Sequence, residues 1–209
     1  MKVLLVNGSP HKEGCTFTAL SEIAGELEKC GVGSDLFWIG GGPLAGCLGC
    51  DACGRTGRCF RSDAVNEFLD IADRYDGFVF GAPVHFAGIA GDAASFMNRA
   101  FYLGSVRTSR LAGKPAAAVV SARRAGTTAS LDQLNRYFLA GNMPVVPSVY
   151  WNMVHGNTPE QVRQDREGLL VMRTLARNMA WMLRCFEAGR SSGAGFPACE
   201  PRVFTDFIR

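Results

Sequence analysis

Long hydrophobic runs are missing from this sequence. No apolar stretch approaches the roughly 18 residues that a membrane-spanning helix requires. The short apolar run near the N-terminus ends at Gly8-Ser9-Pro10, well before it could form the core of a signal peptide. These absences predict a protein that stays in the cytoplasm, where thiols are kept reduced. The eight cysteines are therefore not expected to form disulfides.

A strong excess of charge of one sign is also missing. The 22 basic and 19 acidic residues leave a formal net charge of only +3, which argues against nucleic acid or a membrane surface as the natural partner. One stretch, residues 104–126, carries basic side chains and no acid. It is either a contact for phosphate groups or a solvated face. Its basic residues are Arg107, Arg110, Lys114, Arg123 and Arg124.

Two nucleotide-binding motifs are absent as well. The first glycine-rich loop, residues 7–16, is neither Gly-x-x-x-x-Gly-Lys-Ser/Thr nor Gly-x-Gly-x-x-Gly. This counts against a P-loop nucleoside-triphosphatase and against a dinucleotide-binding Rossmann domain. The sequence also shows no internal repeat and no low-complexity tract.

What the sequence does contain is a regular alternation of strand and helix signals. Its 209 residues are 47% hydrophobic, which suits one domain with a packed core. Helices are predicted at residues 16–29, from Ser62, at 92–103, at 130–139 and at 158–186, the last starting at a Thr-Pro-Glu-Gln capping box. Strands are predicted at 2–6, 34–39, 77–80, 115–120 and 145–151. Five buried strands alternating with helices predict an α/β fold, a doubly wound five-stranded parallel sheet with helices on both faces. Residues 189–209 are expected to form an irregular tail.

Three loops follow the first, third and fourth predicted strands and would meet at one edge of such a sheet. The loop at residues 7–16 offers glycines, the hydroxyls of Ser9 and Thr16, and the start of a helix, which together suit a phosphate group. The loop at 82–88 carries aromatic side chains that can stack on a flat ring. The loop at 121–126 lies beside them. Together they predict a site for a monophosphate ligand with a planar ring.

Gly8-Ser9-Pro10 with Gly14-Cys15-Thr16, followed by Pro83-Val84-His85-Phe86 and Gly88, resembles the NADPH-dependent FMN reductases of the flavodoxin-like superfamily. The cysteine-rich insertion points to their iron–sulfur flavoprotein branch. The resemblance implies a flavodoxin-like FMN-binding domain over residues 1–188, with a cysteine-rich loop at 40–60. The family commonly has arginine, asparagine and tyrosine where this chain has His11, Cys15 and His85.

The resemblance also implies which residues surround FMN. Ser9, His11, Cys15, Thr16 and Thr18 would surround its phosphate. Pro83, Val84, His85 and Phe86 would face the isoalloxazine ring, and Ser121, Arg123, Arg124, Ala125 and Gly126 would lie along its pyrimidine side. The flavin carries the chemistry in such proteins, so no catalytic residue is assigned.

Cys47, Cys50, Cys53 and Cys59 form the most specific local pattern in the chain. Two consecutive spacers of two residues let one short loop surround a metal centre. Structural zinc more often uses two pairs set well apart, so the compact run favours a 4Fe–4S cluster over zinc, and a metal-free loop remains open. Four other cysteines lack this spacing and are read as small buried or incidental thiols: Cys15, Cys30, Cys185 and Cys199.

Two later segments are read as packing rather than as cofactor contacts. Residues 149–156 carry Trp151 and His155, and core packing explains them better than a cover over the flavin. Met172, Met179, Trp181 and Met182 are expected to form the packing face of a helix.

These observations lead to one functional expectation with two alternatives. The chain is expected to be an FMN-dependent oxidoreductase that accepts electrons from NAD(P)H and passes them to a small acceptor, such as a quinone or flavin, or to a ferredoxin-type partner. The resemblance implies a homodimer or homotetramer. The alternatives are an electron-transfer or redox-sensing flavoprotein without turnover of its own, and a zinc-stabilised binding module.

Overall fold

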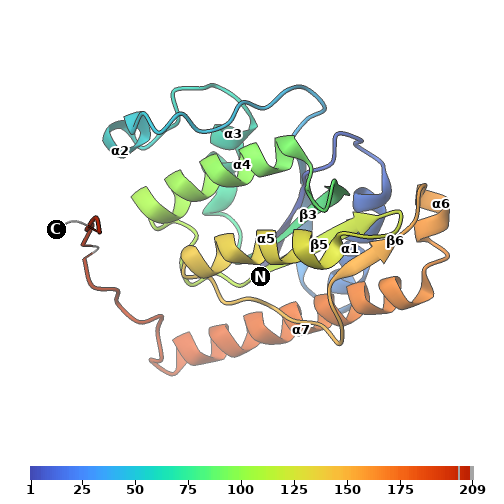
Figure 1. Cartoon of the computed structure of the whole chain (residues 1–209). Helices are drawn as coiled ribbons and strands as arrows, with labels where there is room; N and C mark the ends of the chain where they lie inside the picture. Colours follow the sequence, from blue (N-terminus) through green and yellow to red (C-terminus); the bar gives the residue numbers. More distant parts are fainter. Residues whose placement is uncertain (202, 208–209) are drawn as a thin grey trace.

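A computed structural model describes residues 1–201 and 203–207, and its centre is a parallel β-sheet (Figure 1). The five parallel strands are β1 (Lys2–Asn7), β2 (Gly33–Trp38), β3 (Gly77–His85), β5 (Ala116–Ala122) and β6 (Met153–His155), in the order β2-β1-β3-β5-β6. A short strand, β4 (Gly88–Ile89), pairs antiparallel with the end of β3. The α/β fold with a five-stranded parallel sheet is thus confirmed.

Helices cover both faces of this sheet. α1 (Cys15–Lys29) and α7 (Arg166–Ser191) pack together on one face. α3 (Ala64–Ala72), α4 (Gly91–Phe101) and α5 (Thr127–Ala140) cover the other, as Figure 1 shows. None of the helices in the described residues is long and apolar enough to cross a membrane.

The strands divide their side chains between two hydrophobic cores. Val79 of β3 lies in the core beneath α1 and α7, whereas Phe78 and Phe80 lie in the core beneath α3, α4 and α5. This division follows from the two-residue period of a strand, which sends neighbouring side chains to opposite faces. The second core is built on phenylalanines, with the Phe68 and Phe96 rings meeting edge to face at 5.4 Å. Burial on both faces explains why the strands are near-continuous apolar runs.

The region predicted as one helix at residues 158–186 is two helices. Thr158 caps α6 (Pro159–Val162) by accepting from the Gln161 N–H, but the helix then ends. Asp165 starts α7 by accepting from the Gly168 N–H, and its other oxygen accepts from His155 N of β6. Because an aspartate is among the best N-caps, it begins a new helix and ties it to the sheet. α7 then continues to Ser191. Within the tail predicted at 189–209, residues 202, 208 and 209 lie outside the described residues.

The prediction of a strand at 145–151 was wrong in its position. Val145 makes only an isolated bridge to Ala116, and the regular pairing is made by Met153–His155 against β5. Pro147 has no N–H to donate, which prevents a continuous ladder there. The predicted packing role of this segment was also wrong in part, since Val149, Tyr150 and Trp151 are exposed.

Other boundaries differ by smaller amounts. The helix expected from Ser62 is capped by Asp63, whose carboxylate accepts from Val65 N. The helix predicted at 92–103 ends as α4 at Phe101 and continues as the π-helix η1 (Tyr102–Arg107). The cysteine-rich loop holds a short helix, α2 (Ala52–Thr56). Met172 and Met179 are buried as expected, but Trp181 is exposed.

We expect one buried carboxylate to make the fold sensitive to acid. Glu26 of α1 accepts from Lys29 Nζ (3.1 Å) and from Arg177 Nε of α7 (2.6 Å), and these bonds lower the pKa of its carboxyl below the ordinary 4.5. A carboxyl whose pKa is lowered by folding stabilises the protein above its unfolded pKa, and this contribution is lost as pH falls through the folded pKa. Glu26→Gln should therefore unfold at lower denaturant concentration than wild type at pH 7, and the difference should shrink below about pH 4.5.

Urea unfolding at the two pH values, followed by circular dichroism, measures this. Glu187→Gln, which removes an exposed pair with Arg190 within α7, is the control and should change little at either pH. If Glu26→Gln were less stable than wild type by the same amount at both pH values, the lowered pKa of Glu26 would not be the cause of the acid sensitivity.

Candidate functional site

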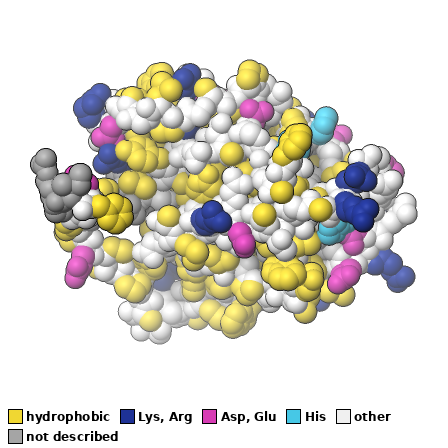
Figure 2. Space-filling model, viewed as in Figure 1, with side chains coloured by type: hydrophobic (Ala, Val, Ile, Leu, Met, Phe, Trp, Pro, Cys, Tyr) yellow, Lys and Arg dark blue, Asp and Glu magenta, His cyan; other side chains and the backbone are white. Residues whose placement is uncertain are grey.

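The three loops that follow β1, β3 and β5 lie at one edge of the sheet. β1 and β5 flank β3, and the registers pair Asn7 with Gly81 and Pro83 with Ser121, so the strands end side by side. The chain reverses its direction of sheet growth between β1 and β3, which is where ligands bind in open α/β sheets. On this side of the molecule, at the right of Figure 2, histidine side chains lie among both basic and acidic ones.

The conformation of the loop after β1 is fixed by hydrogen bonds from its own side chains. The buried Asn7 side chain accepts from Ser9 N (3.0 Å) and donates to Lys12 O (3.0 Å), and Ser9 Oγ accepts from His11 N (3.1 Å). Gly8 N donates to Gly81 O (2.8 Å), and a Cβ at Gly8 would lie only 2.9 Å from that oxygen. Glycine is therefore required where the loop leaves the sheet.

The loop leads to the N-terminus of α1. Gly14 is the N-cap, no side chain among the described residues caps it, and the first turn contains no acidic residue. The first N–H groups of a helix have no partner within the helix, and together with the helix dipole they make this end an anion-binding position. Two threonine hydroxyls nearby already have partners. Thr16 Oγ1 is bonded to Ser121 Oγ (2.8 Å), which joins the first and third loops, and Thr18 Oγ1 donates to Gly14 O.

Cys15 is half-buried at the start of α1, with its Sγ 3.6 Å from Gly156 O. Burial raises the pKa of its thiol, so at neutral pH it is uncharged. A neutral thiol places no negative charge beside the anion-binding end of the helix.

The loop after β3 is a two-residue hairpin between β3 and β4. Phe86 and Ala87 both have positive φ, 50° and 59°, which is the type I′ conformation that usually selects asparagine and glycine. The turn is fastened to α5 by a bond from Ile89 N to Gln133 Oε1 (3.0 Å). Its tip leaves the side chains of His85 and Phe86 exposed.

The loop after β5 approaches this hairpin closely. An added Cβ at Gly126 would lie 2.7 Å from the Ala87 Cα, and Gly126 has a φ of +91°. Arg123, Arg124 and Ala125 are exposed, while Ser121 is buried. The basic stretch at 104–126 therefore does not form one surface. Arg107 pairs with Asp51 (2.7 Å), and Lys114 Nζ donates to Ala72 O, so only the last two arginines lie at the sheet edge.

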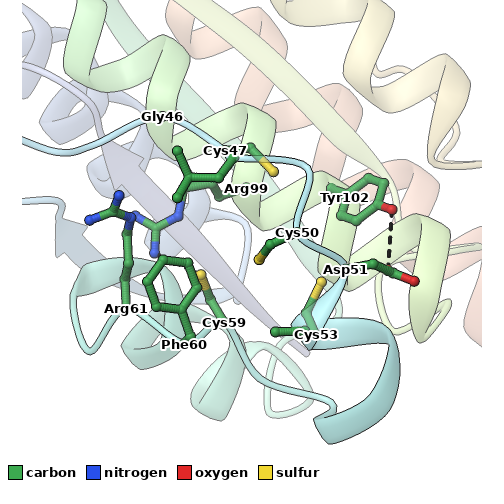
Figure 3. Close-up of a pocket in the computed structure, with 12 residues that line it drawn as sticks. Gly46, Cys47, Cys50, Asp51, Cys53, Cys59, Phe60, Arg61, Arg99 and Tyr102 are labelled. Carbon is green, nitrogen blue, oxygen red and sulfur yellow. Dashed lines mark hydrogen bonds between the residues drawn. The ribbon is translucent and has the colours of Figure 1, made fainter.

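A second candidate site lies in the cysteine-rich loop, over the C-terminal end of α4. Figure 3 shows the sulfur atoms of Cys47, Cys50, Cys53 and Cys59 around one cavity, which Arg61, Arg99 and Tyr102 also line. Within the described residues, no three Cys, His, Asp or Glu side chains converge closely enough to hold a single metal ion. The four thiols thus share a cavity without sharing a central point.

The loop that carries these cysteines is firmly tied to the fold at Cys59. The Asn66 side chain of α3 accepts from Cys59 N (3.0 Å) and donates to Cys59 O and Arg61 O (2.9 and 2.8 Å). On the other side, Asp51 at the start of α2 accepts from Tyr102 Oη and pairs with Arg107. The four remaining cysteines lie elsewhere, Cys15 and Cys30 partly buried and Cys185 and Cys199 exposed.

The family model for NADPH-dependent FMN reductase matches residues 1–158. The chain belongs to this family. An iron-sulfur flavoprotein of Methanocaldococcus jannaschii is 28% identical over 191 residues, which cover 88% of this chain and 98% of the relative. Among solved structures, RosB with a bound 8-demethyl-8-formylriboflavin-5′-phosphate has a TM-score of 0.70 at 15% identity, covering 100% of this chain and 94% of RosB.

A flavodoxin, WrbA-like protein from Agrobacterium tumefaciens has a TM-score of 0.64 at 14% identity, covering 88% of this chain and 98% of that protein. The fold of this FMN reductase family member is thus flavodoxin-like, as predicted. Membership supports an oxidoreductase, as the resemblance implied.

Several residues that shape the two sites were not predicted from the sequence. Asn7 builds the first loop, Trp38 Nε1 donates to Ser9 O (2.8 Å), and Asn66 holds Cys59. Asn7 is a polar residue at the end of a buried strand, a signal that could have been used. The contacts of Trp38 and Asn66 depend on segments 29 and 7 residues away, which no local pattern indicates.

Strain in the β3–β4 turn gives a stability prediction. A non-glycine residue in the left-handed region costs about 1 kcal/mol, so Ala87→Gly should raise the free energy of unfolding by about that amount. The measurement is urea unfolding of the protein without cofactor. Ala125→Gly, in the neighbouring loop and without positive φ, is the control and should destabilise slightly. Equal effects of the two changes would contradict the prediction.

Proposed function

We propose that this FMN reductase family member is an FMN-dependent oxidoreductase. It takes electrons from NAD(P)H and passes them to a small acceptor, such as a quinone or flavin, or to a ferredoxin-type redox partner. The observation that carries the proposal is the meeting of three ligand-suited loops at the switch point of the sheet. FMN held there would supply the redox chemistry: it would take a hydride, two electrons and one proton, from the nicotinamide and return the electrons to the acceptor.

The chain's contribution at this edge is to bind and orient the cofactor. The N-terminal N–H groups of α1, together with Ser9 and His11, suit the FMN phosphate. The hydroxyls of Thr16 and Thr18 are already bonded within the protein, so they shape the cradle rather than donate to the ligand. The uncharged Cys15 thiol occupies a position where a carboxylate would repel phosphate.

The hairpin and the loop after β5 supply the surroundings of the ring. Pro83, Val84, His85 and Phe86 lie on one side, and Ser121, Arg123, Arg124, Ala125 and Gly126 lie on the next loop along the sheet. The exposed Phe86 ring offers a face for stacking, and the two arginines offer positive charge where reduced flavin would carry negative charge.

The cysteine cavity suits a 4Fe–4S cluster better than zinc. Each cysteine of such a cluster binds a different iron, so four thiols around a shared cavity need not converge on one point. Within the described residues, the Nε atoms of Arg61 and Arg99 are buried without a hydrogen-bond partner, and both arginines line the cavity. Cluster sulfur atoms are acceptors that would satisfy them. A cluster held by Cys47, Cys50, Cys53 and Cys59 would carry single electrons to or from the flavin.

Two further parts of the proposal concern the setting of the protein. We place it in the cytoplasm, where its eight unpaired cysteines stay reduced.

We also propose a homodimer or homotetramer, supported by the exposed apolar side chains of Val149, Tyr150 and Trp151 beside the strand ends.

Anaerobic mixing of the FMN-loaded protein with NADPH, and separately with NADH, tests the enzymatic proposal. Direct loss of the flavin's visible absorbance is the expected result. Reduction only by ferredoxin would support the alternative of an electron carrier without turnover, and a protein that binds no FMN would overturn both.

Phe86 allows a test of the flavin position. Phe86→Asn removes the aromatic ring, and asparagine is a favoured residue in a type I′ turn. We expect this change to weaken FMN binding up to about tenfold, which is the loss expected for one aromatic stacking contact. Ala87→Gly is the matched control, since it relieves the same turn and keeps the ring, and its FMN affinity should stay within about twofold of wild type. Titration of the cofactor-free protein with FMN, followed by flavin fluorescence, measures both. Unchanged affinity in Phe86→Asn would remove Phe86 from the site.

The cysteine loop gives a test by metal analysis. After anaerobic purification and reconstitution, wild type should hold about four iron and four sulfide per chain, and Cys59→Ser should hold far less. Cys185→Ser, an exposed cysteine of α7, should match wild type. Zinc in place of iron and sulfide would favour the zinc-stabilised module instead.

A further inference from the structure

Arg99 is the one arginine of α4 and is almost completely buried, at 3% exposure. Charged side chains are seldom buried unless they are paired, because removing a charge from water is costly. The buried guanidinium must therefore be paired with an opposite charge. Its location beside the cysteine loop also calls for an explanation.

One side of the guanidinium is taken by a carboxylate. Asp63 receives two parallel bonds from Arg99, at 2.6 Å from Nη1 and 3.0 Å from Nη2. Asp63 also caps α3, so its place is set by the helix that it starts. This paired geometry fixes the plane of the guanidinium, which a lysine could not reproduce.

The other donors of Arg99 are directed at the cysteine loop. Nη2 donates to Cys59 Sγ (3.1 Å) and Nη1 to Ala45 O (3.3 Å), two residues before Cys47. Nε is buried without a partner among the described residues, and Arg99 lines the cavity of the four cysteines (Figure 3). One side chain therefore contacts the loop close to both its first and its last cysteine.

We propose that Arg99 is a positioning residue that raises the reduction potential of the cluster held by Cys47, Cys50, Cys53 and Cys59. This inference rests on the proposed function, because it requires the cluster to be present. Reduction adds one electron to the cluster, and no bond forms or breaks. The added negative charge lies beside a fixed N–H donor and a guanidinium in a poorly solvated place, so the reduced form is stabilised more than the oxidised form.

A structural role alone would give a different result. If Arg99 only fastened the loop to α4, its loss would lower stability or cluster content but leave the potential of any assembled cluster unchanged. The potential is therefore the readout that separates the two roles.

The experiment compares four reconstituted proteins: wild type, the double variant R99M/D63N, D63N and R58Q. R99M/D63N removes the donors and the charge without leaving an unpaired carboxylate, and asparagine keeps the cap of α3. D63N keeps Arg99 and removes only the negative charge. R58Q removes an arginine of the same loop that pairs with Asp70 and does not line the cavity.

Midpoint potentials of the cluster and of FMN are measured by dithionite titration with redox mediators, following the cluster by electron paramagnetic resonance. In R99M/D63N we expect the equilibrium between reduced and oxidised cluster to shift about tenfold towards oxidised, a fall of about 59 mV for a one-electron couple. The FMN potential should match that of wild type. D63N should show no fall, and R58Q should match wild type.

An unchanged cluster potential in R99M/D63N, or an equal fall in R58Q, overturns the role of Arg99 while leaving the proposed function in place. A wild-type protein that takes up no iron and sulfide overturns the proposed cluster and this role together. If R99M/D63N takes up no cluster, Arg99→Lys takes its place: it keeps the charge and loses the planar fork. A smaller fall in this variant supports the inference, and no change overturns it.

Discussion

Burial of the sheet on both faces is the constraint on which the rest of this protein depends. Each central strand must place apolar side chains alternately under α1 and α7 and under α3, α4 and α5, so the middle of these strands is apolar. The polar groups of the first candidate site therefore lie where these strands end. Because β1, β3 and β5 are parallel neighbours, the loops after them share one edge, and the close approach of Gly8 to Gly81 sets how the first loop leaves it.

α4 connects the two candidate sites. Its N-terminal end follows the β3–β4 hairpin, and its C-terminal end carries Arg99 and leads to Tyr102 at the cysteine cavity. Arg99 lies eight residues beyond Gly91, about 12 Å along the helix. In Figure 1 the cysteine-rich loop runs over α4 away from the strand ends. The sheet-edge site and the cysteine cavity thus lie towards opposite ends of α4.

The two sites also differ in what holds them. The loop after β1 at the sheet edge is shaped mainly by backbone and by short side chains of its own, such as Asn7 and Ser9. The cysteine loop depends on side chains from α3 and α4. Asn66 hydrogen-bonds to the backbone of Cys59, and Arg99 donates to its sulfur atom. Loss of a single helix residue can therefore change the second site without any change in its cysteines.

The sequence by itself determined the order of strands and helices, the three loops and the cysteine spacing, because these depend on local periodicity and on the chemistry of neighbouring residues. Only the tertiary structure decided the rest. Pro147 interrupts strand pairing, so the last strand lies later in the chain than the local pattern predicts. Asp165 caps a new helix, so the last predicted helix is divided in two. The fork of Arg99 between Asp63 and Cys59 joins residues 36 and 40 positions apart, and such a contact exists only when packing brings α3 and α4 together.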